Sequence, residues 1–297
     1  MNDDTNDDLR RRIRALGNEM GPGMLAGTEA IFAPLAPRPA AGHCTIVRDL
    51  AYGPDPRHRL DLFRPTEDGA GRPILVYVHG GGFVRGDKGG PDDPFYGNIG
   101  IWAARRDFIG AVITYRLAPA HRWPAGAEDV AAAVAWLRAN AASHGGDPAR
   151  VFVAGQSAGA AHVAGYAATP RLHGGRAPAG AIMLSGLYDV TRLADNASAQ
   201  AYYGTDTSRY PGQSSLPGLI TSDVPCLFTV AEYDPATFQE QAALVVQEWW
   251  AAKGEWPRML YLPDGNHISA GLAIGSPHDR LSEEIAAFVR KFPEEAA

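Results

Sequence analysis

The chain has few cysteines: Cys44 and Cys226 are the only two among its 297 residues. Two thiols cannot build the disulfide framework of a small secreted domain. No CxxC or HExxH spacing occurs either, which argues against a structural zinc site. Both cysteines stand in apolar runs typical of strands, so we expect buried, unpaired thiols.

Long hydrophobic runs and excess positive charge are also missing. No run of 18 apolar residues occurs, so nothing in the sequence predicts a membrane span. The 27 basic residues are outnumbered by 33 acidic ones, giving a net charge of −6 and little support for nucleic-acid binding. Residues 1–8 are polar and acidic, unlike a secretory signal. We expect a cytoplasmic protein whose partner is a small molecule.

What the sequence does contain is a regular alternation of short apolar runs and helical stretches. Continuous β-branched runs such as 74–78 predict strands that are buried on both faces. Their alternation with amphipathic stretches predicts a single α/β domain over 1–297, with a mainly parallel eight-stranded sheet. We expect strands at 45–50, 59–63, 74–78, 109–115, 151–154, 181–184, 226–230 and 259–262, and helices at 128–140, 158–168, 238–252 and 281–292.

Two segments lie outside this alternation. Near the N-terminus, Leu9, Ile13 and Leu16 recur at helical spacing among four arginines, which predicts a helix with a solvated basic face rather than a membrane-binding one. Glycine and proline at 21–23 end this helix, and prolines at 34, 37 and 39 mark a linker. The segment 187–221 is rich in Tyr, Ser, Gly and Asp and fits no strand or long helix. We expect 1–42 and 187–221 to form a small cap.

The sharpest motif is GQSAG at 155–159, which follows the strand 151–154 and precedes a helical run. This context is the one in which a G-x-S-x-G serine is a nucleophile on a tight strand-to-helix turn. The glycines leave room for strand and helix to pass closely. Ser157 is therefore the candidate nucleophile, and the alternative is a helix N-cap serine.

A second motif, HGGGF at 79–83, directly follows the strand 74–78. Consecutive glycines make sense where backbone N–H groups must point at a developing oxyanion. The matching donor is the N–H of Ala158, just after the nucleophile. A phosphate cradle is the alternative, but Gly80, Gly82 and Gly86 miss the GxGxxG spacing and no GK[ST] follows. We interpret His79 as bracing the loop rather than as a base.

A serine nucleophile needs a base, which in this order of elements follows it along the chain. His162 lies in the same helix and is expected to be packed, while His173 stands in a loop and is expected to be solvated. His278 is expected to cap the last helix. His267 follows the strand 259–262, and the strand-end loops of a parallel sheet carry ligand chemistry. His267 is therefore the candidate base.

The base needs a carboxylate to orient it. Asp234 lies in a strand-end loop one strand before His267. Glu232 stands close by as the runner-up. Asp189 follows an earlier strand, a less usual place, and Asp264 is too near His267 in sequence to orient it well. Asp234 is the candidate acid.

Taken together, these motifs resemble the α/β-hydrolase superfamily. Within it, the chain is most similar to hormone-sensitive-lipase-like carboxylesterases and to the kynurenine-formamidase-like group. The resemblance covers about 43–292 and includes DLFRP at 61–65, YRLAP at 115–119, Trp-Pro at 123–124 and an acidic pair at 128–129, which we interpret as bracing Arg116. It implies a triad and an oxyanion hole without a metal or cofactor, formed by Ser157, Asp234 and His267, and by Gly81, Gly82 and Ala158. Some relatives dimerise through the last helix and strand, so a homodimer is an open expectation.

Gln156 departs from the Asp that often precedes the nucleophile in lipase-like esterases, which leaves the substrate group open. The first hypothesis is a carboxylesterase for short to medium acyl chains or aryl esters. The second is an arylformamidase of the N-formylkynurenine type. The third is a non-catalytic receptor, although such relatives usually lack a triad member. An aromatic substrate site is expected from Phe83, Tyr188, Tyr202 and Tyr203, with ordinary packing as the alternative for each.

Overall fold

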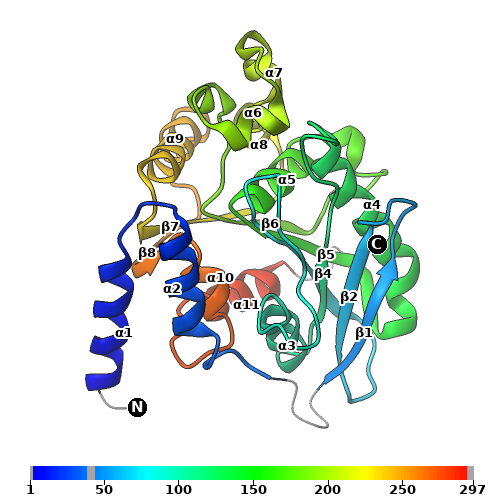
Figure 1. Ribbon diagram of the computed structural model, residues 1–297. Coiled ribbons are helices and arrows are strands. Elements are labelled where there is room, and N and C mark those ends of the chain that lie inside the picture. The colour runs from blue at the N-terminus through cyan, green and yellow to red at the C-terminus, as the bar shows by residue number, and fades with distance from the viewer. Residues whose placement is uncertain (1–2, 39–43, 293–297) are drawn as a thin grey trace.

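The computed structural model describes residues 3–38 and 44–292 and is built around one eight-stranded sheet (Figure 1). The strand order is β1-β2-β4-β3-β5-β6-β7-β8. Strands β1 and β2 pair antiparallel with each other, as do β2 and β4, and the remaining pairs are parallel. The predicted α/β class and mainly parallel eight-stranded sheet are confirmed. The strands are β1 (Cys44–Ala51), β2 (Arg59–Pro65), β3 (Arg72–Val78), β4 (Ile109–Ile113), β5 (Gly146–Gln156), β6 (Gly180–Leu184), β7 (Cys226–Tyr233) and β8 (Met259–Asn266).

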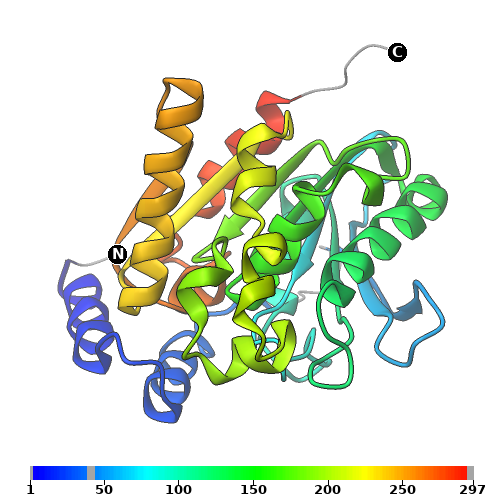
Figure 2. The same ribbon diagram turned by 90° about the horizontal axis from the view of Figure 1, so that it is seen from above.

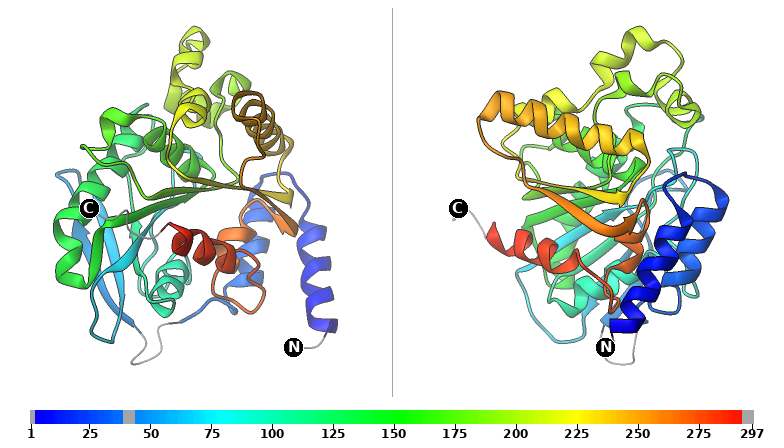
Figure 3. Two further views of the ribbon diagram at one scale, coloured as in Figure 1. Left: turned by 180° about the vertical axis from the view of Figure 1, so that it is seen from behind. Right: turned by 90° about the vertical axis from the view of Figure 1, so that its left-hand side faces the viewer.

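Helices cover both faces of this sheet, which explains why its central strands are apolar throughout (Figures 2 and 3). Every residue of β3 is buried. On one face α4 (Ala125–Asn140), α5 (Ala158–Ala167) and α9 (Ala236–Lys253) contribute to a core with the sheet. On the other, α3 (Gly97–Arg105) and α11 (Ser282–Lys291) contribute to a second core.

The segment 187–221 forms short helices beyond the sheet, at the top of Figure 1. They are the 3₁₀ turns Val190–Leu193 and Thr207–Arg209 and the helices α6 (Ala197–Tyr203), α7 (Tyr210–Gln213) and α8 (Leu216–Thr221). The expectation of no strand and no long helix is confirmed for this segment. Part of it packs in an aromatic cluster with Ala158, the residue after the candidate nucleophile.

The N-terminal region forms two helices rather than one, α1 (Asp3–Leu16) and α2 (Pro22–Phe32). The sequence predicted only that residues 21–23 end the first helix. α1 ends earlier, at Leu16, and Pro22 begins a second helix that was not predicted, because proline is tolerated in a first turn, where no backbone N–H is needed. α1 packs against β8, and α2 packs against α10 (Ser269–Ala273). Ile13, Phe32 and Leu272 belong to one buried cluster. The exposed arginines of α1 form the expected solvated face.

The structure also tests the predictions for the two cysteines, for His173 and for a membrane span. Cys44 and Cys226 are both free, the second buried and the first half-buried. His173 is 8% exposed and its Nε2 lies 3.0 Å from the Tyr166 carbonyl oxygen, so the expectation of a solvated loop histidine is wrong. Over 3–38 and 44–292, no helix is long and apolar enough to cross a membrane.

Candidate active site

Ser157 occupies a strained turn between β5 and α5. Its φ of 57° and ψ of −121° are rarely adopted by residues with a side chain. The turn is fixed by the Ser157 N–H, which donates to the Leu184 carbonyl at 2.9 Å. A Cβ on Gly155 would lie 2.5 Å from the Gly159 backbone, and one on Gly159 would lie 2.1 Å from the Val78 carbonyl oxygen. Both glycines are therefore required for the close passage of strand and helix.

His267 and Asp234 form a buried pair at the ends of neighbouring parallel strands. His267 Nδ1 lies 2.7 Å from Asp234 Oδ1, and the two side chains are 1% and 0% exposed. The other ring nitrogen, Nε2, is buried and has no hydrogen-bond partner within the described part of the chain. The structure thus brings the predicted acid and base together and leaves the ring nitrogen needed for proton transfer free.

Asp234 is held in place by two further donors. Its Oδ2 accepts from the Ser185 hydroxyl and from the Ala231 backbone N–H, each at 2.7 Å. Hydrogen bonds of this kind fix the orientation of the carboxylate that receives the histidine N–H. No sequence motif pointed to Ser185, although its place directly after the apolar run 181–184 marks it as a strand-end residue.

The backbone around His267 is held from several directions. The Asn266 side chain donates to Thr28 Oγ1 on α2 at 2.7 Å, and its backbone N–H donates to Ser269 Oγ at 2.8 Å. The Phe238 ring lies over the imidazole, with ring centroids 4.0 Å apart. No sequence signal pointed to Thr28, which precedes its partner by 238 residues.

The glycine-rich loop after β3 lies against the serine turn. A Cβ on Gly80 would lie 3.4 Å from Ser157 Cβ, so this loop begins beside the nucleophile. Gly81 and Gly82 have φ of 122° and 59°, conformations that favour glycine. Over the described ranges, their N–H groups donate no hydrogen bond. Ala158 begins α5, where a helix leaves its first amides unpaired. These are the donors that an oxyanion hole requires.

His79 braces the loop from inside the protein. Its Nδ1 lies 2.6 Å from the Gly80 carbonyl oxygen, and its ring stacks on Tyr115 with centroids 4.4 Å apart. Tyr115 OH donates to the His79 carbonyl at 3.0 Å. Burial lowers the pKa of His79 to about 4, and burial together with nearby His79 lowers that of His162 to about 3. Both rings are therefore neutral at pH 7 and unsuited to carry charge in catalysis.

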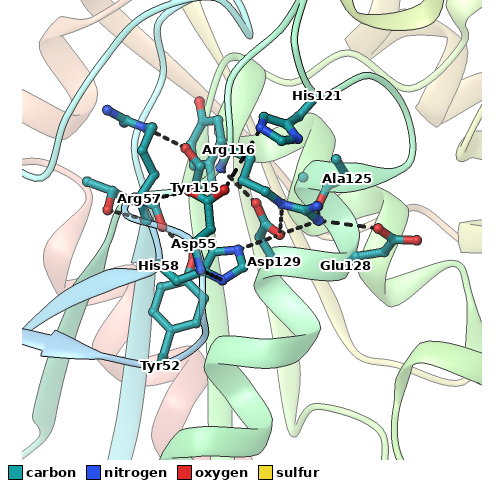
Figure 4. A network of polar contacts seen from close by, with 12 residues as sticks. Tyr52, Asp55, Arg57, His58, Tyr115, Arg116, His121, Ala125, Glu128 and Asp129 are labelled. Atoms are coloured by element: carbon teal, nitrogen blue, oxygen red, sulfur yellow. Dashed lines mark hydrogen bonds and ion pairs between the residues drawn. The ribbon is translucent and has the colours of Figure 1, made fainter.

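Figure 4 shows the polar network behind this loop. Arg57 donates through Nε to the Tyr115 carbonyl at 2.7 Å and through Nη2 to the Gly86 carbonyl at 2.8 Å. The loop that carries the candidate oxyanion donors is thus held to the segment after β4 and to the β1–β2 turn by one guanidinium group.

The acidic pair at 128–129 belongs to the same network (Figure 4). Buried Asp129 accepts from the Arg116 backbone N–H at 2.7 Å and from its Nε at 2.8 Å, and Glu128 Oε2 lies 3.3 Å from the same guanidinium. His58 Nε2 lies 3.0 Å from Asp129 Oδ1. The expectation that the pair braces Arg116 is confirmed.

Aromatic side chains pack in one cluster beside the serine turn. Phe83 stacks on Tyr202 with centroids 4.8 Å apart and an interplanar angle of 2°, and it contacts Tyr203 edge-on at 5.5 Å. These rings share one cluster with Ala158. Tyr188 lies apart from them in the main core, 5.6 Å from Phe228. The structure therefore groups three of the four predicted substrate-binding residues.

The alternative acids are engaged elsewhere. Glu232 Oε2 accepts from the Asp264 backbone N–H at 2.8 Å. The Asp264 carboxylate pairs with Arg10 at 3.1 Å and with Arg280 at 3.2 Å. Asp234 is the acid that contacts His267.

Comparison with known proteins agrees with the fold described above. A family model described as alpha/beta hydrolase fold matches residues 75–217. The chain has the α/β-hydrolase fold. An esterase from the bacterial hormone-sensitive lipase family shares this fold with a TM-score of 0.70 and 22% identity, over 99% of this chain and 100% of that one. The α/β-hydrolase resemblance inferred from the sequence is confirmed.

Sequence relatives of this chain match over shorter stretches. A probable isoprenylcysteine alpha-carbonyl methylesterase of Oryza sativa subsp. japonica is 38% identical over 119 residues, 40% of this chain and 27% of that protein. Carboxylesterase NlhH of Mycobacterium tuberculosis is 46% identical over 94 residues, 29% of this chain and 26% of that protein. The chain thus spans about a quarter of the length of these relatives.

Proposed function

We propose that this protein is a serine hydrolase that cleaves carboxylic esters of short to medium acyl chain or aryl type. The observation that carries the proposal is the buried His267–Asp234 pair, with His267 Nδ1 2.7 Å from Asp234 Oδ1. The Nε2 of this histidine has no hydrogen-bond partner in the described part of the chain, and the loop that carries His267 contacts Gln156 in the serine turn. Relatives and structures of the same fold that are named as esterases support it.

In this mechanism Ser157 attacks the acyl carbon while His267 Nε2 takes the hydroxyl proton. Asp234 accepts the Nδ1–H, which fixes the tautomer with a free Nε2 and stabilises the imidazolium that forms. Because Asp234 also accepts from Ser185 and Ala231, its carboxylate holds one orientation during the cycle. His267 then returns the proton to the alcohol, and water repeats the steps on the acyl-enzyme.

The tetrahedral intermediate carries negative charge on the former carbonyl oxygen. The amides of Gly81, Gly82 and Ala158 receive this charge, and their backbone positions are set before substrate arrives. Such preorganised donors each contribute about 10²–10³ in rate in other acyl-transfer enzymes. The Arg57 and Tyr115 contacts behind the loop keep the donors in place.

The segment 187–221 acts as a cap in this proposal, and Phe83, Tyr202 and Tyr203 form the wall of the substrate site. Hydrogen bonds of Tyr202 attach the segment 187–221 to the chain around the start of α4, which supports its role as a cap. The Tyr202 carbonyl accepts from the Trp123 N–H at 2.9 Å, and the Tyr202 hydroxyl oxygen accepts from the Gly126 N–H at 3.1 Å. The assignment of 1–42 to the cap stays a prediction, as do a cytoplasmic location and a homodimer.

The test is hydrolysis of p-nitrophenyl acetate, butyrate and decanoate by the wild type, by Ser157→Ala and by Ser143→Ala. Ser143 is an exposed serine and serves as the matched control. We expect Ser157→Ala to lose at least about a thousandfold in kcat/KM, as removal of a triad member does elsewhere. A phosphonate ester should label the wild type and the control once, and not label Ser157→Ala.

Two outcomes would contradict the proposal. If Ser157→Ala kept wild-type activity, the nucleophile would be another residue. If all three proteins were inert toward the esters and the phosphonate, the ester function would be wrong, and an aryl formamide would be the next substrate assayed.

A further inference from the structure

Gln156 is a buried amide placed between the serine turn and the histidine loop. Its side chain is 1% exposed, and it precedes Ser157 in the chain. Its Nε2 donates to the backbone carbonyl of His267 at 2.7 Å. Its Oε1 accepts from Tyr77 OH at 3.2 Å. Tyr77 belongs to β3, which leads into the glycine-rich loop, so one amide contacts the three segments that carry the candidate site.

The amide is tightly enclosed. A Cβ on Gly271 of α10 would lie 2.5 Å from Gln156 Oε1 and 2.9 Å from Tyr77 OH. From the other side, Asn98 of α3 donates to the Gly271 carbonyl at 3.0 Å and to that of Ile274 at 3.1 Å. α10 is thus held by Asn98 on one side and lies close against Gln156 and Tyr77 on the other.

This contact complements the fixation of the imidazole. Asp234 sets the rotation of the ring through Nδ1, but it does not set where the His267 backbone stands relative to Ser157. The Gln156 link does so, since it starts from the residue joined covalently to the serine. We propose that Gln156 is a positioning residue that sets His267 at the distance from Ser157 needed for proton transfer, and that its amide N–H is the group required.

An amide is suited to this role, and a carboxylate is not. The His267 carbonyl can only accept a hydrogen bond, and an ionised carboxylate can only accept as well. Glutamate at this position would keep the size and the acceptor for Tyr77 but would lose the donor. This inference rests on the proposed serine-hydrolase function.

Two variants and one control test the link. Gln156→Met keeps the length of the side chain without polar atoms, and Gln156→Glu replaces the N–H donor with a carboxyl oxygen of the same size. Thr229→Val is the control, because Thr229 is buried in the same sheet, in β7, and its hydroxyl has no partner in the described part of the chain. Each protein is assayed for kcat and KM with p-nitrophenyl butyrate and for its thermal midpoint. The downfield proton resonance of the His267–Asp234 hydrogen bond is recorded by NMR.

We expect both Gln156 variants to lose about 10- to 100-fold in kcat, because misplacement of a catalytic group by about 1 Å costs this much. Their KM should stay within about twofold, since the substrate walls are untouched. Their downfield proton should shift or broaden, while Thr229→Val should match the wild type in every readout.

The outcomes that overturn the inference are distinct from failure of the proposed function. A folded Gln156 variant with kcat within about threefold of the wild type, or with an unchanged downfield proton, would show that the link does not position the base. Unfolding of both variants would show that Gln156 serves the fold instead. If the wild type itself cleaved no ester, the proposed function would fail, and the downfield proton would still decide whether Gln156 positions His267.

Discussion

Acidification should destabilise this protein through His79 and His162. Both side chains are fully buried, and burial lowers their pKa from 6.5 to about 4 and about 3. In the unfolded chain both regain a pKa near 6.5. As pH falls, the two histidines are therefore protonated first in the unfolded state. The free energy of unfolding is highest above pH 6.5 and decreases progressively as pH falls toward the folded pKa values.

The magnitude follows from the two pKa values. From about pH 7.5 to about pH 5, each histidine lowers the free energy of unfolding by about 2 kcal/mol. At about pH 5 the imidazole is mostly protonated in the unfolded state and mostly neutral in the folded state. The two together cost about 4 kcal/mol, a large share of the roughly 5–15 kcal/mol typical of a domain.

Urea unfolding at both pH values, followed by fluorescence of the six tryptophans, measures this loss. His79→Gln and His162→Gln should each remove about half of it, since glutamine does not titrate, whatever the variant does to stability at pH 7.5. His121→Gln is the control, because that side chain is 40% exposed. If His79→Gln and His162→Gln lost as much stability on acidification as the wild type, burial of these rings would not be the cause.

Three further substitutions test contacts described above. Asp234→Asn should lower kcat by about 10⁴ with little change in KM, because the amide favours the wrong histidine tautomer; a loss below tenfold in ester hydrolysis would exclude Asp234 as the orienting acid. Thr28→Val should destabilise by about 1–3 kcal/mol in urea unfolding, because it leaves the buried Asn266 amide without its acceptor, and unchanged stability would contradict this. Arg116→Met should cost toward the low end of about 3–5 kcal/mol, since it leaves buried Asp129 with His58 as its side-chain partner and Arg116 itself is partly exposed; a thermal midpoint equal to that of the wild type would refute it.

The strands and the candidate triad could be predicted because each rests on a local signal. Apolar runs predicted the buried strands, and a parallel sheet brings the carboxyl ends of its strands to one edge. Ser157, Asp234 and His267 each follow such a run within about five residues, so their order along the chain was enough to propose their meeting. The contact at 2.7 Å between the last two agrees with that reasoning.

What could not be predicted depends on contacts between distant segments. Pro22 looked like a helix breaker because its neighbours are glycines, yet α2 forms and buries its apolar side against α10. His173 looked like a loop histidine because two glycines follow it, but packing on Tyr166 buries it. The partner of Gln156 was equally hidden, because it is a backbone carbonyl 111 residues away.

The hydrogen bond between Thr28 and Asn266 has a consequence for how the protein is made. During synthesis the first of these residues precedes the second by 238 positions. At a synthesis rate of about 5–20 residues per second, β8 and α10, which pack against α1 and α2, are made roughly 10–50 s after these helices. During that interval the side chains of Ile13, Ile31 and Phe32, buried in the finished protein, have no native partner from the end of the chain. The two helices α1 and α2 thus leave the ribosome well before the segments that bury them in the folded protein.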